Sequence, residues 1–251
     1  MTVRAVGRTD VGLARKENQD NFLILPALSV YAVADGMGGH AGGGQASAIA
    51  VEALRRALHG GGASGAVDRG AAYAVDEAGV EDALALANAM IMAEADKMKW
   101  AGMGTTLVLA YPAGDRWMVA HIGDSRAYVV SRDRIYALTK DHSLVEELLS
   151  RGSITQEEAK VHPHRHVLTR ALGTEADKKP TWSSVAAAEA PYLLLCTDGL
   201  YNMLEEETMQ RIVVAPDLTL EEKADRLVEE ANAMGGLDNI TVILIAEEDG
   251  V

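Results

Sequence analysis

Four short apolar runs follow one another between Thr105 and Thr139, and only short turns containing Gly or Asp separate them. Two parallel strands need a crossover of about a dozen residues between them, and none of these turns is that long. The segment therefore predicts a meander of antiparallel strands rather than an alternation of strands and helices. The four runs are Thr105–Tyr111, Arg116–Ile122, Ala127–Ser131 and Ile135–Thr139.

The rest of the chain adds further strands and separate helices. Runs rich in Val, Ile, Leu and Tyr predict strands at Val3–Gly7, Asn21–Leu25, Val30–Ala34, Thr181–Ala186, Tyr192–Thr197 and Asn239–Ala246. Helical spacing predicts helices at Gly44–His59, Ala71–Lys99, Ser143–Ser150 and Leu220–Ala233, with Ser143 and Thr219 as N-caps. Because the helices are segregated from the strands, we expect an α+β fold. In it, two antiparallel β-sheets pack as a central sandwich flanked by α-helices, in the four-layer order αββα.

The chain has the size and composition of one domain. Its 251 residues, 48% of them apolar, suffice for a large core, and no polar linker divides them, so we expect a single domain over residues 1–251. A formal net charge of -14 argues against nucleic acids and anionic membranes as partners, because both need clustered Lys and Arg. We expect a monomer, since nothing indicates a coiled coil.

The sequence also bears on the compartment. Its one cysteine, Cys196, excludes an internal disulfide and favours a reducing compartment. The first residues contain no apolar core of a signal peptide, and no run approaches the roughly 18 apolar residues of a membrane span. We therefore expect a cytoplasmic protein.

One aspartate stands between an apolar strand and a run of glycines. Asp35 follows the strand predicted at Val30–Ala34, and six glycines occur in the nine residues after it. A carboxylate at the mouth of a buried strand is costly unless it is paired or binds a cation. We expect Gly36 to allow a tight turn whose carbonyl points back toward the same ion. Taken alone, an apolar run followed by Asp-Gly is more often a strand that leads into a turn.

Four other aspartates lie at the edges of predicted strands, namely Asp20, Asp124, Asp198 and Asp238. If all five converge on one rim, their oxygens suit hard cations such as Mg²⁺ or Mn²⁺. Two such ions, bridged by one carboxylate and about 3.5–4 Å apart, can turn a shared water into hydroxide and hold the oxygens of an in-line phosphoryl displacement. The pattern thus favours two-metal phosphoryl chemistry, provided that the side chains converge.

Eight blocks of the sequence occur in an order that is typical of one protein family. They read ARKENQDNF, VADGMGGHAGG, GTTLVLA, HIGDSRAYV, LTKDHSLV, LTRALG, LLCTDGL and LDNITVILI, and they extend from about Thr9 to Ile245. In these blocks the chain resembles the metal-dependent protein phosphatases, the PPM or protein phosphatase 2C-like family, in its compact bacterial form. The resemblance implies hydrolysis of phosphoserine and phosphothreonine in proteins with two or three Mn²⁺ or Mg²⁺ ions. It implies phosphorylated proteins as partners, among them a Ser/Thr protein kinase that the enzyme would oppose.

The resemblance also assigns the metal ligands position by position. Asp35 would bridge the two core metals, and Gly36 would offer its carbonyl to one of them. Asp198 and Asp238 would complete the shell of the other metal. Asp20 would hold the site partly through metal-bound waters.

Further roles follow from the same resemblance. Asp124, with Asp198, would bind a third, weaker metal. Arg15 matches the arginine that grips the substrate phosphate as a bidentate fork. Asn239 would steady the last metal loop. Hydroxide bridging the two ions would attack phosphorus with no phosphoenzyme, because the chain lacks the D-x-D motif of the aspartyl-phosphate hydrolases.

Two positions depart from the family pattern. Gln19 stands beside the metal ligands where many relatives have Glu, which removes one charge and weakens the expected metal affinity. Met37 stands where animal members have a His that is proposed to protonate the leaving group. His40 lies close by in the sequence and could take that role, although a metal-bound water could do the same.

Three other features are interpreted as structural. We expect a mobile flap at about residues 151–173, so the run His162 to His166 within it faces substrate or solvent rather than zinc. Asp141 to Ser143 contain the residue types of a hydrolase triad, but such triads are assembled across a fold, so Ser143 is interpreted as a helix cap. Cys196 is expected to be a buried thiol.

Two alternatives to a general Ser/Thr phosphatase stay open. A non-catalytic phosphoprotein-binding or sensor module would keep the fold, although such relatives usually lose acidic ligands and here all five are present. A phosphatase restricted to anti-anti-sigma regulators would keep the chemistry, although such relatives commonly lack the flap and the motif around Asp124. Metal-dependent hydrolysis separates the enzyme from the binding module.

Overall fold

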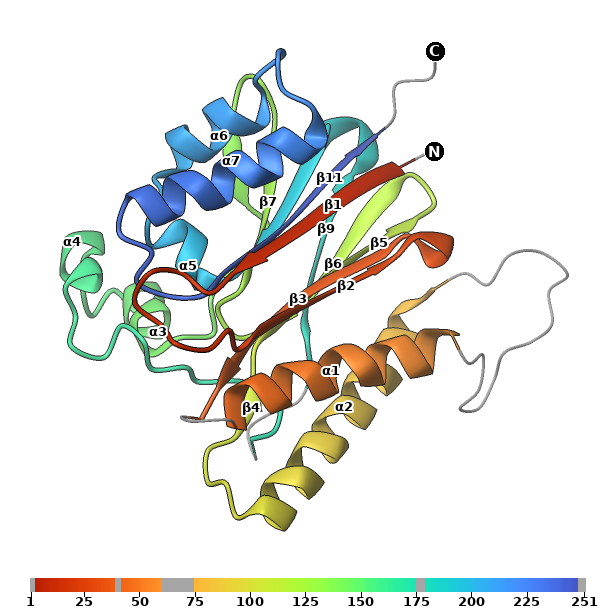
Figure 1. The fold of residues 1–251 in the computed structure, drawn as a ribbon, viewed down its shortest axis with the longest axis vertical. Helices are drawn as coiled ribbons and strands as arrows, with labels where there is room; N and C mark the ends of the chain where they lie inside the picture. The colour runs from red at the N-terminus through yellow and green to blue at the C-terminus, as the bar shows by residue number, and fades with distance from the viewer. Residues whose placement is uncertain (1–2, 39–41, 60–74, 175–178, 248–251) are drawn as a thin grey trace, which may run out of the picture.

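The computed structural model describes residues 3–38, 42–59, 75–174 and 179–247, and these ranges form two antiparallel sheets that lie face to face between helices (Figure 1). One sheet has the strand order β1 (Val3–Asp10), β11 (Ile240–Glu247), β10 (Tyr192–Cys196), β7 (Arg126–Val130), β8 (Ile135–Ala137). The other has the order β2 (Asp20–Leu25), β3 (Val30–Met37), β5 (Leu107–Ala113), β6 (Arg116–Ile122), β9 (Thr181–Ala186), with β4 (Gly104–Thr105) paired to the end of β3. The predicted α+β sandwich is confirmed. The single four-strand meander predicted between Thr105 and Thr139 is wrong, because β5 pairs with β6 and β7 with β8, whereas β6 and β7 belong to different sheets.

Helices cover the outer face of each sheet (Figure 1). The sheet of β2 and β3 packs against α1 (Gly42–His59) and α2 (Glu77–Met98). The sheet of β1 and β11 packs against α5 (Asp198–Tyr201), α6 (Glu206–Val213) and α7 (Leu220–Ala233). The connection from β8 to β9 contains α3 (Leu144–Ser150) and α4 (Gln156–Lys160), and short 3-10 helices lie at Pro26–Leu28 and Ala187–Glu189. None of the helices in the described ranges combines the length and the apolarity needed to cross a lipid bilayer.

Strand β3 shows why the central runs are apolar throughout. Val30, Ala32 and Ala34 pack in the layer of α1 and α2. Tyr31 and Val33 pack against the other sheet instead. Because neighbouring residues of a strand point to opposite faces, a strand between two buried layers must be apolar at every position. The first charged residue of β3, Asp35, therefore marks the end of the core.

The structure corrects the sequence prediction around Asp35. Strand β3 continues through Asp35 to Met37, because Gly36 and Met37 pair with Thr105 and Gly104 of β4. Gly36 is therefore part of an extended strand, and the tight turn predicted there is wrong. The first described residue after Asp35 with a positive φ is Gly38, at +123°.

Several helix boundaries follow from local sequence. Ser143 Oγ accepts a hydrogen bond from Glu146 N at 3.3 Å, and Thr219 forms a reciprocal capping box with Glu222, so both predicted N-caps are confirmed. The spacing of apolar residues does not predict α4, α5 and α6, whose 5, 4 and 8 residues are too few to show a helical period clearly.

Two further expectations concern a helix start and the cysteine. The helix predicted at Ala71–Lys99 corresponds to α2, which begins at Glu77 after the N-cap Asp76; residues 71–74 of the prediction lie outside the described residues.

Cys196 is fully buried in β10, and burial raises the pKa of its thiol to about 12. The predicted buried thiol is confirmed, and it stays protonated near neutral pH.

Candidate active site

The five predicted aspartates come from both sheets. Asp20 begins β2 and stands directly opposite Asp35 on β3. Asp124 lies in the turn from β6 to β7, which connects the two sheets. Asp198 begins α5 directly after β10, and Asp238 lies two residues before β11. Segments that are far apart in the sequence are therefore brought to one end of the sandwich.

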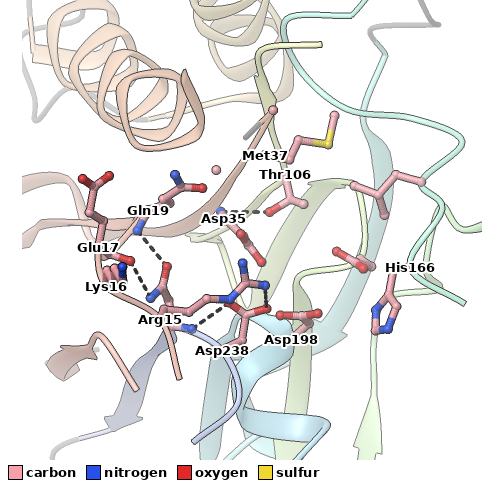
Figure 2. Close-up of a pocket in the computed structure, with 15 residues that line it drawn as sticks. Arg15, Lys16, Glu17, Gln19, Asp35, Met37, Thr106, His166, Asp198 and Asp238 are labelled. Carbon is pink, nitrogen blue, oxygen red and sulfur yellow. Dashed lines mark hydrogen bonds and ion pairs between the residues drawn. The ribbon is translucent and has the colours of Figure 1, made fainter. Parts of the chain in front are cut away.

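A cavity of about 840 Å³ opens where these segments meet (Figure 2). Four of the predicted ligands, Asp35, Asp124, Asp198 and Asp238, line the cavity, whereas Asp20 is buried next to it with 5% of its surface exposed. The other lining residues are Arg15, Lys16, Glu17, Gln19, Gly36, Met37, Gly38, Thr106, His166, Leu168 and Asn239.

Two threonines hold the backbone of Asp35. The amide of Asp35 donates to Thr106 Oγ1 at 3.0 Å, and its carbonyl accepts from Thr105 Oγ1 at 2.8 Å and from the amide of Thr106 at 2.9 Å. Thr106 Oγ1 also lies 2.7 Å from Ser125 Oγ, next to Asp124. Sequence reasoning did not single out these threonines, because hydroxyl residues at the start of a strand are common.

Asp20 and Asp198 each have one oxygen without a partner. Thr197 Oγ1 donates to Asp20 Oδ2 at 2.8 Å, and Asn202 Nδ2 donates to Asp198 Oδ2 at 3.1 Å. The Oδ1 atoms of both aspartates are buried and have no hydrogen-bond partner among the described residues. Because buried acceptors are rarely left unsatisfied, these two oxygens indicate a ligand that binds among them.

The pKa values of the clustered aspartates also indicate a bound ligand. Burial, together with repulsion from neighbouring aspartates, raises the pKa of Asp20 to about 7, that of Asp124 to about 8 and that of Asp198 to about 6. Burial, followed by repulsion from Asp20, also holds the pKa of Asp35 well above its usual range. Carboxylates this close are costly to ionise together unless a cation offsets their charge.

The donor set fits hard divalent cations, which prefer carboxylate and carbonyl oxygens. In the ranges that the structure describes, no three His, Cys, Asp or Glu side chains already stand close enough to bind one ion by themselves. Hydrated Mg²⁺ commonly keeps several waters and takes only one or two carboxylates. A cluster of carboxylates spread along a cavity, with two buried oxygens unpartnered, therefore suits such ions.

Both Asp-Gly pairs of the site need glycine because another segment packs against it. A Cβ at Gly36 would collide with the carbonyl of Gly43 at the start of α1. A Cβ at Gly199 would collide with the carbonyl of Asn239. The missing side chains thus let helix α1 and the loop of Asp238 approach the aspartates closely. At Gly36, this close approach replaces the predicted turn as the reason for glycine.

Arg15 lies at the mouth of the cavity (Figure 2). Its Nη2 is 2.7 Å from Asp238 Oδ2, and 55% of its side chain is exposed. The guanidinium is thus held beside one predicted ligand and remains open to the cavity. An arginine in this position can bind an anion that enters the cavity beside Asp238.

Asn239 joins two loops of the site. Its Nδ2 donates to the carbonyls of Val11 and Glu17 at 2.9 and 3.0 Å, and its Oδ1 accepts from the amide of Gln19 at 2.8 Å. The carbonyl of Gln19 accepts in turn from the amide of Gly36 at 3.1 Å. Asn239 and Gln19 therefore tie together the chain segments next to Asp238, Asp20 and Asp35.

The histidines differ in their relation to the cavity. The candidate His40 lies outside the described residues. Met37, at the position where animal members have His, lines the cavity. His166, from the segment after α4, also lines the cavity, while His164 is exposed. The sequence run from His162 to His166 is thus not one functional unit, because only its last member lines the cavity.

Known proteins resemble this chain along most of its length. The family model described as protein phosphatase 2C matches residues 14–231. The chain is 40% identical over 244 residues to the serine/threonine phosphatase stp of Listeria innocua, over 95% of this chain and 93% of the relative. It is 35% identical over 254 residues to the protein phosphatase PhpP of Streptococcus pneumoniae, over 96% of this chain and 97% of the relative.

Solved structures are also similar. The serine/threonine phosphatase PstP/Ppp of Mycobacterium tuberculosis matches with a TM-score of 0.83 and 35% identity, over 99% of this chain and 100% of that chain. The catalytic domain of PstP in complex with two manganese ions matches with a TM-score of 0.82 and 34% identity, over 98% of this chain and 99% of that chain. With these matches along nearly its whole length, the chain belongs to the protein phosphatase 2C family.

Proposed function

We propose that this enzyme hydrolyses phosphoserine and phosphothreonine in proteins, with two Mn²⁺ or Mg²⁺ ions bound among its aspartates. The observation that carries the proposal is the buried aspartate cluster, with raised pKa values and two unpartnered oxygens at a cavity whose mouth holds Arg15. Relatives named serine/threonine phosphatase support the substrate class, and the manganese complex of PstP supports the metal.

The place of each aspartate suggests its role. Asp35, whose pKa is raised by burial and by four neighbouring carboxylates, would hold both ions, and the carbonyl of Gly36 would hold one of them. Asp198 and Asp238, on the opposite sheet, would hold the second ion. Asp20, which does not line the cavity, would act mainly through bound water.

Further features of the site would serve the reaction. When bound, two such ions lower the pKa of a water molecule and neutralise charge on the phosphoryl oxygens. Arg15 would donate two hydrogen bonds to the substrate phosphate from its place beside Asp238. Thr105 and Thr106 fix the backbone of Asp35, so its carboxylate needs little reorganisation during the reaction. Asp124, with Asp198, would bind a third and weaker ion.

The test is hydrolysis of p-nitrophenyl phosphate and of a phosphothreonine peptide by the purified protein with Mn²⁺, Mg²⁺, Ca²⁺ or EDTA. We expect activity with Mn²⁺ or Mg²⁺ and a loss of at least about 10³-fold in Asp35→Ala, because the variant lacks the ligand proposed to hold both ions. Asp133→Ala, at an exposed aspartate away from the cavity, is the matched control and should keep full activity.

Calorimetric titration with Mn²⁺ gives a second readout that does not depend on turnover. Asp35→Ala should bind fewer ions or bind them more weakly than the wild type. A folded wild-type protein without activity in any metal would contradict the proposal and favour the phosphoprotein-binding module.

We further propose that the substrates are products of a Ser/Thr protein kinase and that the enzyme acts as a monomer. The first part follows from the chemistry, since phosphoserine and phosphothreonine in proteins are formed by kinases of that class. Light scattering coupled to gel filtration tests the second part, and a mass of two chains would contradict it.

A further inference from the structure

A second cavity, of about 850 Å³, adjoins the first one. The two cavities share five lining residues, namely Arg15, Asp124, His166, Asp198 and Asp238. The second cavity extends from these residues along the segment of α3 and α4 and the segment of α5 and α6, which supply most of its other lining residues. It therefore begins at the place where the proposed function puts the substrate phosphate.

The walls of the second cavity carry many apolar side chains. Val145 and Leu149 lie one helical turn apart on α3, so they share a face, and both line the cavity. The α5–α6 segment contributes Met203, which is partly exposed, and Leu204 and Met209, which are almost fully buried. Methionine side chains are flexible and polarisable, so they can adapt to apolar groups of different shape.

The charged and polar groups of this cavity already have partners. Arg126 binds Asp141 through two hydrogen bonds of 2.9 and 2.7 Å and stacks over the ring of Tyr201 at 3.7 Å. Glu146 lies 3.2 Å from Lys140 Nζ. Four charged residues at its edge, Lys160, Arg165, Glu205 and Glu206, are exposed and balance in sign. Apart from the residues shared with the first cavity, the lining carries three positive and four negative side chains, and one of the negative ones, Glu146, is paired with Lys140 outside the lining. The cavity thus has little net charge that would select a charged group.

The edge next to the phosphate site is also apolar. The side chains of Leu13, Met234 and Leu237 are 71%, 64% and 61% exposed, and Leu237 lines the second cavity. Their two loops are held together because the amide of Leu13 donates to the carbonyl of Gly236 at 2.7 Å. Large apolar side chains that gather in water beside a cavity are typical of a binding surface. Leu13 and Leu237 also lie within two residues of Arg15 and Asp238, respectively.

We propose that the second cavity, with Met203 in its wall, and the edge formed by Leu13, Met234 and Leu237 bind an apolar side chain of the substrate that flanks the phosphorylated residue. The occupant is a segment of the phosphoprotein, because the cavity adjoins the proposed phosphate site and a peptide chain must leave that site along one of its sides. The inference rests on the proposed function and adds a preference to it: phosphosites flanked by Leu, Met or Phe are better substrates than sites flanked by Gly.

The test compares phosphothreonine peptides that differ only in the residues next to phosphothreonine, which are Leu, Lys, Asp or Gly. We expect kcat/KM to be about tenfold higher for the Leu peptide than for the Gly peptide, the effect of partly burying one leucine side chain. In Leu237→Ser and in Met203→Ser, this ratio should fall toward one. Leu86→Ser, at an exposed leucine of α2 far from both cavities, is the matched control and should keep the wild-type ratio.

The ratio is measured within each variant, so it remains informative where Leu237→Ser also disturbs the neighbouring Asp238. Hydrolysis of p-nitrophenyl phosphate, which has no flanking residue, reports the metal site separately. Equal kcat/KM for the Leu and Gly peptides, or a preference for the Lys peptide, would overturn the inference and leave the proposed function intact. A wild-type protein that hydrolyses none of the peptides and no p-nitrophenyl phosphate would overturn both.

Discussion

Thr106 connects two of the segments that carry aspartates. Its Oγ1 accepts the hydrogen bond of the amide of Asp35 and lies within hydrogen-bond distance of Ser125, which follows Asp124. Thr106 is almost fully buried, so water cannot replace its hydroxyl easily. We expect Thr106→Val, which keeps the shape of the side chain, to lower the free energy of unfolding by about 1–3 kcal/mol, because the amide of Asp35 loses its partner.

Urea denaturation of the metal-free protein measures this loss, and Mn²⁺ titration measures the effect on Asp35. Thr106→Ser keeps the hydroxyl and is the control, with less than half of the effect of Thr106→Val on both quantities. If the valine variant matched the wild type in stability and in Mn²⁺ affinity, the hydroxyl would have no part in holding Asp35.

At the scale of residues, sequence predicts chemical type better than local geometry. An aspartate at the end of an apolar strand is recognisable as a candidate ligand because burying a carboxylate is costly. The hydrogen bonds that Thr105 and Thr106 form with the backbone of Asp35 cannot be recognised in the sequence. They depend on the pairing of two segments that are about seventy residues apart in the chain. The same holds for Gly36, whose need for glycine arises from contact with Gly43.

At the scale of elements, the contact between β3 and the start of α1 can be tested by comparing two glycines, Gly36 in β3 and Gly44 in α1. Gly36→Ala should lower the free energy of unfolding by about 2 kcal/mol or more, because the new Cβ collides with the carbonyl of Gly43, which a backbone shift must relieve. Gly44→Ala is the matched control in α1, where a Cβ would meet only ordinary contacts of 3.7 Å or longer.

Thermal denaturation of both variants measures the difference. Gly44→Ala should be neutral or stabilising by up to about 1 kcal/mol, since alanine is favoured over glycine within a helix. Equal destabilisation by both substitutions would mean that the stretch needs glycine for its flexibility rather than for the close approach at Gly36.

Helices and strands could be predicted from the sequence where their apolar pattern or cap is local and the element is long enough to show it. The apolar runs of the hairpins β5–β6 and β7–β8 and of the central strands are visible in the sequence, and Thr219 starts α7 with a local capping box. The division of these two hairpins between different sheets was not predictable, because it depends on the distant strands that pair with them. The four-residue helix α5 is too short for a period, and the end of β3 depends on the distant β4. Tertiary contacts, rather than propensity, decide such short elements.

At the scale of the whole molecule, the net charge of -14 and the aspartate cluster act together on stability. The cluster gathers like charges from both sheets, so without a cation the folded state brings together carboxylates that the unfolded chain keeps apart. A bound cation therefore stabilises the folded protein, by mass action and by neutralising this repulsion. Protons and metal ions compete for the same carboxylates, so the stability of the folded protein should depend on pH.

The metal-free protein should lose stability as the pH rises. In the folded state the pKa of Asp20 is about 7 and that of Asp124 about 8, against an ordinary value of 3.8. A carboxyl group with a raised pKa binds its proton more tightly in the folded than in the unfolded state. Stability from this source is thus present at low pH and is lost between about pH 4 and pH 8. Because Mn²⁺ binds the ionised form, the stabilisation by Mn²⁺ should increase over the same range.

Scanning calorimetry at pH 5 and pH 8, with EDTA or with Mn²⁺, measures both effects. Asp20→Asn removes one titrating carboxyl but keeps an oxygen that can accept the hydrogen bond of Thr197. This variant should therefore stabilise the metal-free protein at pH 8 by about 2 kcal/mol, and by less at pH 5. The exposed Asp133→Asn is the control and should have no such effect. A metal-free protein that is as stable at pH 8 as at pH 5, with no gain from Asp20→Asn, would show that burial and repulsion do not raise the pKa values of these carboxyl groups in the folded state.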